Sequence, residues 1–212
     1  MNTCIKCNIN YKSSYQGSKP VCSPCRKYFI QNAIYNINYN QVAKGGSNLA
    51  TKHTKKMGSD AEIKFAEVIK NKYLYKLRRS TKHEEIKLHY DYVIEKNNSD
   101  YLRIEVKAMK SRRRGNPVDP TIIYLEYKNI IGGPGWLYGK SDYIAFEQPN
   151  SFILVFRNDL VEFGNKMLPK MKLVNKSGIE GTLYSRRNRE DLVGCFDLSD
   201  IITNNKHFIL NK

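Results

Sequence analysis

The sequence contains no run of about 18 or more apolar residues, so it predicts no transmembrane helix. Its first residues, MNTCIKC, also lack the apolar stretch of a signal peptide. We therefore expect an intracellular protein, in the cytoplasm, nucleus or nucleoid, that is not secreted. In such a reducing compartment cysteines bind metal more often than they form disulfides. Hydrophobic residues still make up 41% of the chain, which is enough for a core.

Acidic residues are scarce. The 212 residues include 20 Asp and Glu against 36 Lys and Arg, which gives a formal net charge of +16. The sequence pI is near 9.6. An excess of this size indicates a polyanionic partner, most commonly nucleic acid. The alternative, which the charge alone leaves open, is a basic surface that only aids solubility.

The motifs of several enzyme classes are missing. We find no Ser or Cys arrangement suited to a nucleophilic triad, and no glycine-rich helix start that would hold a phosphate. The stretch GGPGW lacks the Lys and the Ser or Thr of a nucleotide-binding loop, so the use of ATP is not implied.

Composition divides the chain into three zones. Residues 1–30 hold four of the five cysteines, and residues 31–57, with KGGSNLATKHTKKMGS, are expected to be a basic, flexible linker. The hydrophobic pattern becomes regular over residues 58–212, which we expect to form the main domain. The fifth cysteine, Cys195 in VGCFDL, is expected in the core of that domain.

The pattern of the main domain predicts an α/β fold with a mixed sheet flanked by helices. SDAEIKFAEVIKNKYLYKL has helical spacing, and Ser59 or Asp60 is a candidate cap. The apolar residues that share one face of this helix are Ala61, Phe65, Val68 and Ile69. TIIYLEYKNI predicts a strand, and SDYIAFE with SFILVFRN predicts a hairpin around QPN. Signals after about Leu160 are weaker.

The cysteines of the first zone have the spacing of a zinc site. Cys4, Cys7, Cys22 and Cys25 form two C-x2-C pairs with fourteen residues between them. Each pair can supply two corners of a Zn²⁺ tetrahedron, and four thiolates leave no open position, so the ion would be structural. A module this small would depend on the metal for its folding energy. Two disulfides or four free thiols are the alternative. The pattern resembles zinc ribbons and treble clefs.

The stretch HYDYVIEKNNSDYLRIEVKAMK predicts two strands joined by a polar turn. If the turn centres on Asn98, then Asp91 lies opposite Glu105, and His89 lies opposite Lys107. Because strand side chains alternate between faces, these polar groups share one face, while the apolar residues face the core. The sequence therefore predicts two carboxylates and an ammonium group close together.

Like charges opposed across a sheet destabilise it unless something compensates them. A divalent cation is suited to this, because Mg²⁺ binds carboxylate oxygens and retains several waters. A metal-bound water beside a lysine is a nucleophile for phosphodiester hydrolysis. The alternative is a solvated face on which these residues form surface ion pairs.

Asp91, followed after thirteen residues by Glu105-Val106-Lys107, resembles the core of the PD-(D/E)XK nucleases. The resemblance implies a restriction-endonuclease-like fold, in which Asp91 and Glu105 bind Mg²⁺ or Mn²⁺ and Lys107 positions the attacking water. Members often carry a further acid on the preceding helix, and Glu62 matches it. The likeness spans residues 58–156, about half of the chain.

The stretch IIYLEYKNIIGGPGWLYGKSDYIAFE also resembles the continuation in some phage and large-virus members, which implies that the chain is virus-encoded. Tyr90 stands where the motif has proline, a residue that divergent members commonly lack. The resemblance favours DNA over RNA as the substrate, and a resolvase among its members would act as a homodimer.

Basic residues follow the E-x-K strand directly in KAMKSRRRGN, so we expect them to contact backbone phosphates. The candidates for nucleic-acid binding are Lys110, Arg112, Arg113, Arg114 and Lys140. SRRNR at 185–189 is a second basic stretch with poorer context. Glu126 is a candidate for a second metal or water site, and His89 for a phosphate contact, although each is equally suited to a structural role. Trp136 and Tyr138 are expected to fill the core.

These patterns favour a metal-dependent DNA endonuclease, and the resemblance extends to enzymes specific for structures met in recombination, repair or junction resolution. The alternative is a non-catalytic, zinc-containing accessory factor of transcription or replication. The zinc module would then bind nucleic acid or a protein partner. Glu105 and its neighbouring acids favour the nuclease over the accessory factor. Carboxylates beside phosphate contacts repel phosphate unless a cation bridges them, and a binding module has no need of such acids.

Overall fold

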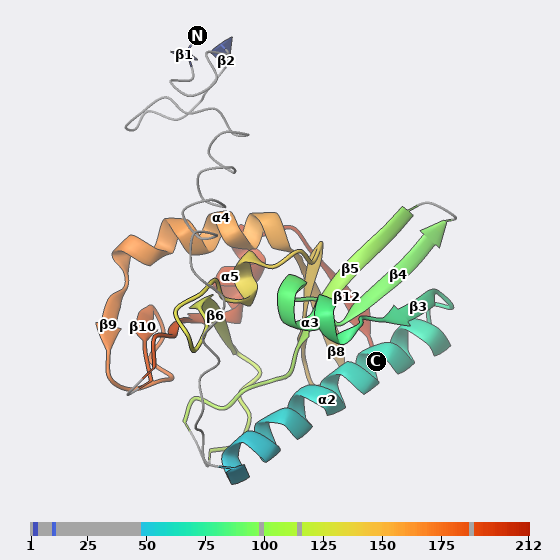
Figure 1. The fold of residues 1–212 in the computed structure, drawn as a ribbon, viewed down its shortest axis with the longest axis horizontal. Coiled ribbons are helices and arrows are strands. Elements are labelled where there is room, and N and C mark those ends of the chain that lie inside the picture. Colours follow the sequence, from blue (N-terminus) through green and yellow to red (C-terminus); the bar gives the residue numbers. More distant parts are fainter. Residues whose placement is uncertain (1, 4–9, 12–47, 98–99, 114–115, 187–188) are drawn as a thin grey trace. The chain divides into compact units, whose positions relative to one another are not determined.

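The computed structural model describes residues 2–3, 10–11, 48–97, 100–113, 116–186 and 189–212 (Figure 1). The chain divides into two compact units, Met1–Gln41 and Val42–Lys212. In the first unit β1 (Asn2–Thr3) pairs antiparallel with β2 (Asn10–Tyr11). The four cysteines expected to bind zinc lie outside the described residues, so the zinc module stays a prediction.

Helix α2 spans Asn48–Asn71 and begins ten residues before the expected start of the main domain. Residues 48–57 of the expected linker are helical, and Ser59 and Asp60 lie inside the helix rather than at its cap. The Lys- and Ala-containing stretch has good helix propensity, which outweighed the Gly and Ser residues that suggested a connector. The helix is followed by Leu74, an exposed residue with φ of +56°, where the chain turns towards the first strand of the main sheet.

Six strands form the main sheet in the order β12-β8-β7-β5-β4-β3. Their bounds are β3 Lys76–Arg79, β4 Tyr92–Asn97, β5 Asp100–Lys107, β7 Tyr143–Glu147, β8 Ser151–Phe156 and β12 His207–Asn211. Only the β5–β7 pair is parallel; the other neighbours are antiparallel. The expected mixed sheet and the expected β7–β8 hairpin are thus confirmed.

A second sheet has the order β6-β11-β10-β9. Its strands are β6 Ile122–Lys128, β9 Lys172–Val174, β10 Thr182–Tyr184 and β11 Leu192–Asp197. The stretch TIIYLEYKNI is a strand as predicted, but β6 pairs with β11 and not with a strand of the main sheet. The sequence did not predict this second sheet, since β9 and β10 are too short to show a pattern.

The described residues also form α3 Lys82–Leu88, α4 Arg157–Met167 and α5 Leu198–Asn204, with 3-10 turns at Trp136–Tyr138 and Leu168–Lys170. Helix α3 begins with a capping box, in which Thr81 and Glu84 each accept a hydrogen bond from the other's backbone N–H. It ends at His89, whose φ is +52°. His89 is therefore a helix cap and not the strand residue that was expected.

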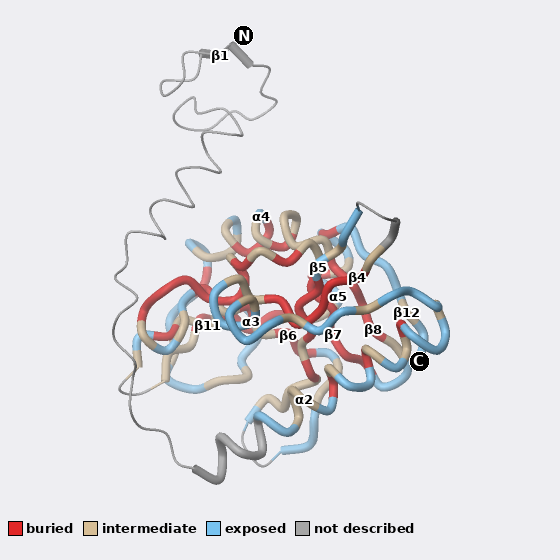
Figure 2. Tube along the Cα trace, turned by 45° about the vertical axis from the view of Figure 1, so that its right-hand side comes forward, coloured by how far each residue is buried: buried red, intermediate tan, exposed pale blue. Residues whose placement is uncertain are grey.

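Two hydrophobic clusters cover the two faces of the main sheet. On one face Phe65 of α2 packs edge-on against Phe152 of β8, with ring centroids 5.2 Å apart, beside Ile104 and Val106. On the other face Ile144 and other strand residues pack with α4 and the second sheet. Figure 2 shows the buried stretches gathered in β6, β7, β8 and β11.

Cys195, Trp136 and the apolar helix residues Ala61, Phe65 and Ile69 are buried as expected. Within the part of the chain that the structure describes, no helix has the length and apolar character needed to cross a membrane.

Candidate active site

The register of the β4–β5 hairpin agrees with the prediction. Val93 lies opposite Arg103, and Glu95 lies opposite Tyr101. Asp91 just precedes β4 and continues the pairing, because its backbone N–H donates to the Ile104 carbonyl oxygen at 2.8 Å. Its carboxylate oxygen Oδ2 accepts a hydrogen bond of 2.6 Å from the backbone N–H of Val106. Asp91 is thus held against β5 beside Glu105.

Glu105 and Lys107 lie on the same face of β5, because they are two residues apart in a strand. The Lys107 ammonium group donates a hydrogen bond to Glu105 Oε1. The same nitrogen lies 4.8 Å from the ring centroid of Trp136. Glu105 is only 6% exposed, so its carboxylate is withdrawn from water and depends on Lys107 for charge compensation.

Burial and the charges of nearby acids disfavour the charged form of both Asp91 and Glu105. Burial, and then the charge of Glu105, raise the pKa of Asp91 to about 7, although Lys107 and the Val106 N–H oppose the shift. Burial also raises the pKa of Glu105 against the effect of Lys107. Burial lowers the pKa of Lys107, but the nearby Glu105 and Asp91 outweigh it, so the net shift is upward and Lys107 stays charged.

Glu62 reaches this cluster from α2. Burial and the charge of Asp91 raise the pKa of Glu62 to about 7. Arg79 of β3 opposes that shift and donates a hydrogen bond of 2.6 Å to Glu62 Oε2. The structure therefore brings together all four residues that the sequence assigned to catalysis: Glu62, Asp91, Glu105 and Lys107. It adds Arg79, which sequence reasoning missed because KLRR was not recognised as a strand.

Glu126 of β6 contributes a further carboxylate near Lys107. Its pKa is raised by burial, while Lys107 opposes the shift. One carboxylate oxygen, Oε2, accepts a hydrogen bond of 3.3 Å from the backbone N–H of Trp136. Gly135 makes this approach possible, because a Cβ there would lie 2.0 Å from the Glu126 carbonyl oxygen. Glu126 thus lies beside the E-x-K lysine although it belongs to the second sheet.

His89 lies close enough to Lys107 for the two to interact electrostatically. Burial, and then the positive charge of Lys107, lower the pKa of His89 to about 4. The imidazole is therefore neutral at physiological pH. Gly139 lies close to the first side-chain carbon of His89, because a Cβ added at Gly139 would lie 2.6 Å from the Cβ of His89.

The basic residues expected to bind nucleic acid are not equivalent. Lys110 is half-buried, and its pKa is lowered by burial and by Lys107. Arg112 contacts Asp119 at 2.5 Å and Glu180 at 2.5 Å, so its guanidinium group joins two segments of the protein instead of projecting freely. Lys140 is half-buried, and its backbone N–H donates to the carbonyl oxygen of Leu88 at 2.6 Å.

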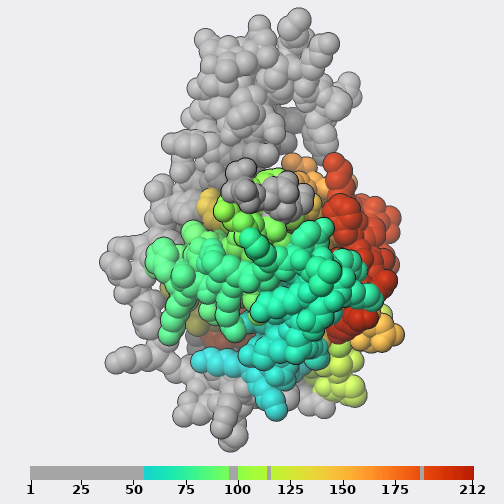
Figure 3. All heavy atoms as spheres, turned by 90° about the vertical axis from the view of Figure 1, so that its right-hand side faces the viewer, coloured from blue at the N-terminus to red at the C-terminus, as the bar shows by residue number. Residues whose placement is uncertain are grey.

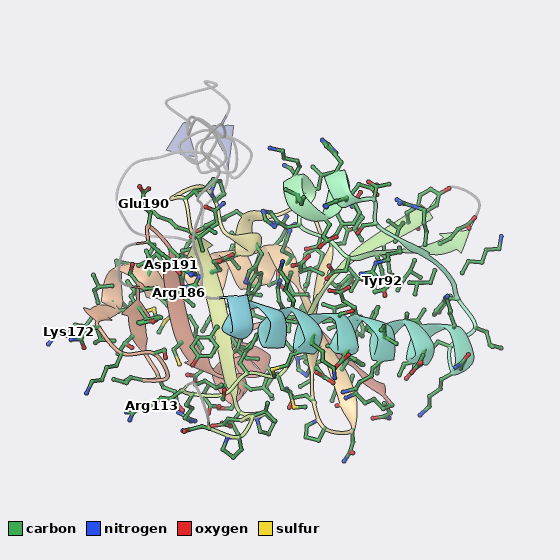
Figure 4. The ribbon with its side chains drawn as sticks, turned by 60° about the horizontal axis from the view of Figure 1, so that its bottom comes forward. Tyr92, Arg113, Lys172, Arg186, Glu190 and Asp191 are labelled. Carbon is green, nitrogen blue, oxygen red and sulfur yellow. The ribbon has the colours of Figure 1, made fainter. Side chains whose placement is uncertain are left out.

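The other basic positions lie further from the acids or outside the described residues. Arg113 is exposed and well apart from Tyr92 of β4 in Figure 4. Arg114 lies outside the described residues. In the basic stretch 185–189, Arg186 forms an ion pair with the buried Asp191, and the two side chains lie together in Figure 4.

The acids fit a divalent cation that keeps most of its water. Mg²⁺ is bound in proteins through one or two carboxylates, with waters and substrate phosphates completing the shell. Asp91 and Glu105 supply two carboxylates, and their repulsion would be relieved by a cation. Among the described residues, no three His, Cys, Asp or Glu side chains form a ready metal-binding group. Asp91 and Glu105 would leave the other positions of such a cation to water or phosphate.

In comparisons with known proteins, no family model, no curated protein and no solved structure matches this chain.

Proposed function

We propose that the chain is a Mg²⁺- or Mn²⁺-dependent nuclease of the PD-(D/E)XK type that hydrolyses phosphodiester bonds of DNA. The observation that carries the proposal is the convergence of Glu62, Asp91, Glu105 and Lys107 at the start of the β4–β5 hairpin. A cluster of acids with raised pKa values is costly for stability, and such clusters are typical of functional sites.

Asp91 and Glu105 would hold the cation, which supplies charge stabilisation and a water of lowered pKa when it is bound. Lys107 stays protonated, so it acts as a donor that orients the attacking water and stabilises the charge developing on the phosphate. Glu62 has a pKa of about 7, which suits a group that accepts the proton of the water at neutral pH. Arg79 holds the Glu62 carboxylate in place.

The strongly basic composition supports a polyanionic substrate, and the net charge of +16 would attract it from a distance. The zinc module in the first unit, if it forms, would add a contact to nucleic acid or to a protein. The intracellular location, the viral source and a homodimer remain part of this proposal.

The test is a cleavage assay with Mg²⁺ or Mn²⁺ on linear duplex, single strands, flaps, four-way junctions and RNA. We expect cleavage by the wild type that is abolished by EDTA and falls at least about 100-fold in Glu105→Ala and in Lys107→Ala. Lys172→Ala is the matched control, because Lys172 is an exposed lysine on β9 of the second sheet. Binding without cleavage under every condition would contradict the proposal and favour the accessory factor.

A further inference from the structure

An open hollow of about 1120 Å³ lies at the end of the main sheet formed by β3, β4 and β5. Figure 3 faces the end of the molecule where these elements meet the last turns of α2, drawn in turquoise to green. The lining residues that matter for its chemistry are Lys70, Tyr75, Lys76, Arg78, Tyr101 and Arg103. The candidate active site does not use any of them.

The hollow continues the face that carries the candidate acids. Arg103 lies two residues before Glu105 on β5, so the two side chains share a face. Arg103 pairs with Val93, which in turn pairs with Arg78 on β3. Tyr101, Glu95 and Lys76 form the next row of the same face. Sheet register thus aligns three rows, from the acids through the arginines to the tyrosine.

The length of this track suits several nucleotides. Glu105 and Tyr101 are four residues apart on β5, which corresponds to ~13 Å at the usual rise of a strand. Stacked nucleotides rise by about 3.4 Å along one strand, so the track matches about four of them. A nucleic-acid strand bound in the hollow could therefore reach the candidate active site while staying on the same face of the protein sheet.

The lining combines exposed aromatic rings with positive charge. Tyr75 and Tyr101 are 47% and 53% exposed, which leaves both rings accessible to a ligand, and tyrosine is enriched at binding interfaces. Lys76 is 81% exposed and makes only a 3.8 Å contact with Glu95. The lining holds four cationic residues and two acidic ones. Aromatic faces and basic groups along one groove are the combination that binds unpaired nucleotides.

Two ion pairs fix the arginines that line the hollow. Arg103 contacts Asp142 through two nitrogens, at 3.1 Å and 3.0 Å. Arg78 makes the same type of two-nitrogen contact with Glu84, at 2.8 Å and 3.0 Å. These arginines are therefore fixed by protein carboxylates, which leaves the other lining residues Lys70, Tyr75, Lys76 and Tyr101 to contact a ligand.

We infer that this hollow binds a single-stranded segment of nucleic acid, with bases stacked on Tyr75 and Tyr101 and phosphates contacting Lys70 and Lys76. Duplex is disfavoured, because the faces of its bases are covered by their neighbours and cannot stack on tyrosine. The inference rests on the proposed nuclease function only in that the bound strand leads to the candidate active site. It specifies a substrate with a single-stranded arm.

The test is fluorescence anisotropy with a labelled single strand of about 16 nucleotides and with a blunt duplex. It uses the full chain without added Mg²⁺ or Mn²⁺, so that no cleavage occurs, and without a chelator that would remove zinc. We expect Tyr75→Ala and Tyr101→Ala each to weaken single-strand binding at least about fivefold and to leave duplex binding within about twofold. Phe208→Ala is the matched control, since Phe208 is a 59% exposed aromatic residue on β12, at the opposite edge of the sheet. It should change neither affinity.

A salt titration tests the phosphate contacts. Lys70→Gln should reduce the slope of log Kd against log salt for the single strand by about 0.7, the value for one phosphate contact. Unchanged single-strand affinity in both tyrosine variants would overturn the inference, and so would an equal loss for single strand and duplex. The first result would point to a protein as the occupant, the second to a general backbone contact.

These outcomes are independent of those for the nuclease. Glu105→Ala should bind the single strand at least as well as the wild type while it loses cleavage. Cleavage that is lost in Glu105→Ala, with single-strand binding insensitive to both tyrosines, overturns this inference alone. Tyrosine-dependent binding by a protein that never cleaves overturns the nuclease and leaves the single-strand site standing.

Discussion

Two buried glutamates on neighbouring strands of the main sheet have opposite electrostatic environments. Glu105 on β5 and Glu147 on β7 are 6% and 5% exposed, and each contacts a lysine. Burial by itself would raise the pKa of both carboxyl groups. The Glu147 pKa is nevertheless lowered overall, because Lys64 at 2.9 Å and Lys212 at 3.2 Å outweigh burial.

Glu105 has one lysine and several acids around it. Its pKa stays raised because the charges of Glu62 and Glu126 add to the effect of burial, and Lys107 does not outweigh them. A carboxylate with an excess of cations stabilises the fold, whereas one with an excess of acids calls for another cation. Burial and a lysine partner are shared by both, so the sign of the remaining neighbours distinguishes a structural carboxylate from a catalytic candidate.

The largest expected effect is a difference in catalytic activity between variants of Glu105 and Glu147. Glu105→Gln is expected to lower kcat/KM for DNA cleavage at least about 100-fold, because the cation loses a charged ligand. Glu147→Gln should leave kcat/KM within a few-fold, because Glu147 belongs to the Lys64 and Lys212 network. Steady-state cleavage in Mg²⁺ measures both. Equal losses in the two variants would contradict the distinction.

Folding stability should fall more in Glu147→Gln than in Glu105→Gln, the reverse of the order expected for activity. Glu147→Gln is expected to lower the free energy of unfolding by about 1–3 kcal/mol, because it leaves Lys64 and the partly buried Lys212 without their carboxylate. Glu105→Gln removes a charge that other acids repel, and Lys107 keeps Asp91 and Glu126 as nearby acids. Its unfolding free energy should therefore not fall below that of the wild type by more than about 1 kcal/mol. Urea unfolding without divalent cations compares the two variants. A larger loss for Glu105→Gln would place Glu105 among the structural carboxylates.

The hairpin that carries Glu105 could be predicted from the sequence because its information is local. A polar turn and alternation predict which residues share a face. The observed pairing of Val93 with Arg103 also depends on a register shift between Glu95 and Asn97, because Asn97 pairs with Asp100 at the turn. The helix that carries Glu62 has a regular apolar stripe, with Ala61, Phe65 and Ile69 all buried. The candidate site lies where these two regular elements meet, so most of its residues were found.

The parts that were missed depend on contacts distant in sequence or on very short elements. Helix α3 has only seven residues, although its capping box, Thr81 and Glu84, is visible in the sequence. Strands β9 and β10 have three residues each and are defined by their partners in the sheet. Arg112 illustrates the limit for function, because nothing in SRRR indicates that Asp119 and Glu180 bind its guanidinium group.

The pH dependence of stability should also separate the two regions. The pKa of Asp91 is raised to about 7 in the folded state from 3.8, so the native state binds the extra proton between these values. This contribution to stability is complete below about pH 3.8 and is lost as the pH rises through about 7. Relative to Asp91→Asn, the wild type should lose at most about 1.4 kcal/mol per pH unit across that window, in metal-free buffer.

Glu147 provides the opposite sign as a control. Its folded pKa lies below 4.5, so the stability that it contributes is present above that pH and is lost as the pH falls. The difference between the wild type and Glu147→Gln should therefore be flat from pH 5 to 8. Thermal unfolding at a series of pH values measures both differences. A flat difference for Asp91→Asn would show that Asp91 ionises normally.

The smallest expected effect is stabilisation by the cation itself. At a Mg²⁺ concentration ten times its Kd, binding to the folded state alone should add about 1.4 kcal/mol to the free energy of unfolding. Asp91 and Glu105 would be the ligands, so Asp91→Asn and Glu105→Gln should lose this increment, while Glu147→Gln should keep it. Because bound Mg²⁺ also favours ionised carboxylates, it should flatten the pH dependence attributed to Asp91. Stabilisation by Mg²⁺ that persists in Asp91→Asn and in Glu105→Gln would place the cation elsewhere. Asp91 and Glu105 would then be buried structural carboxylates and not cation ligands.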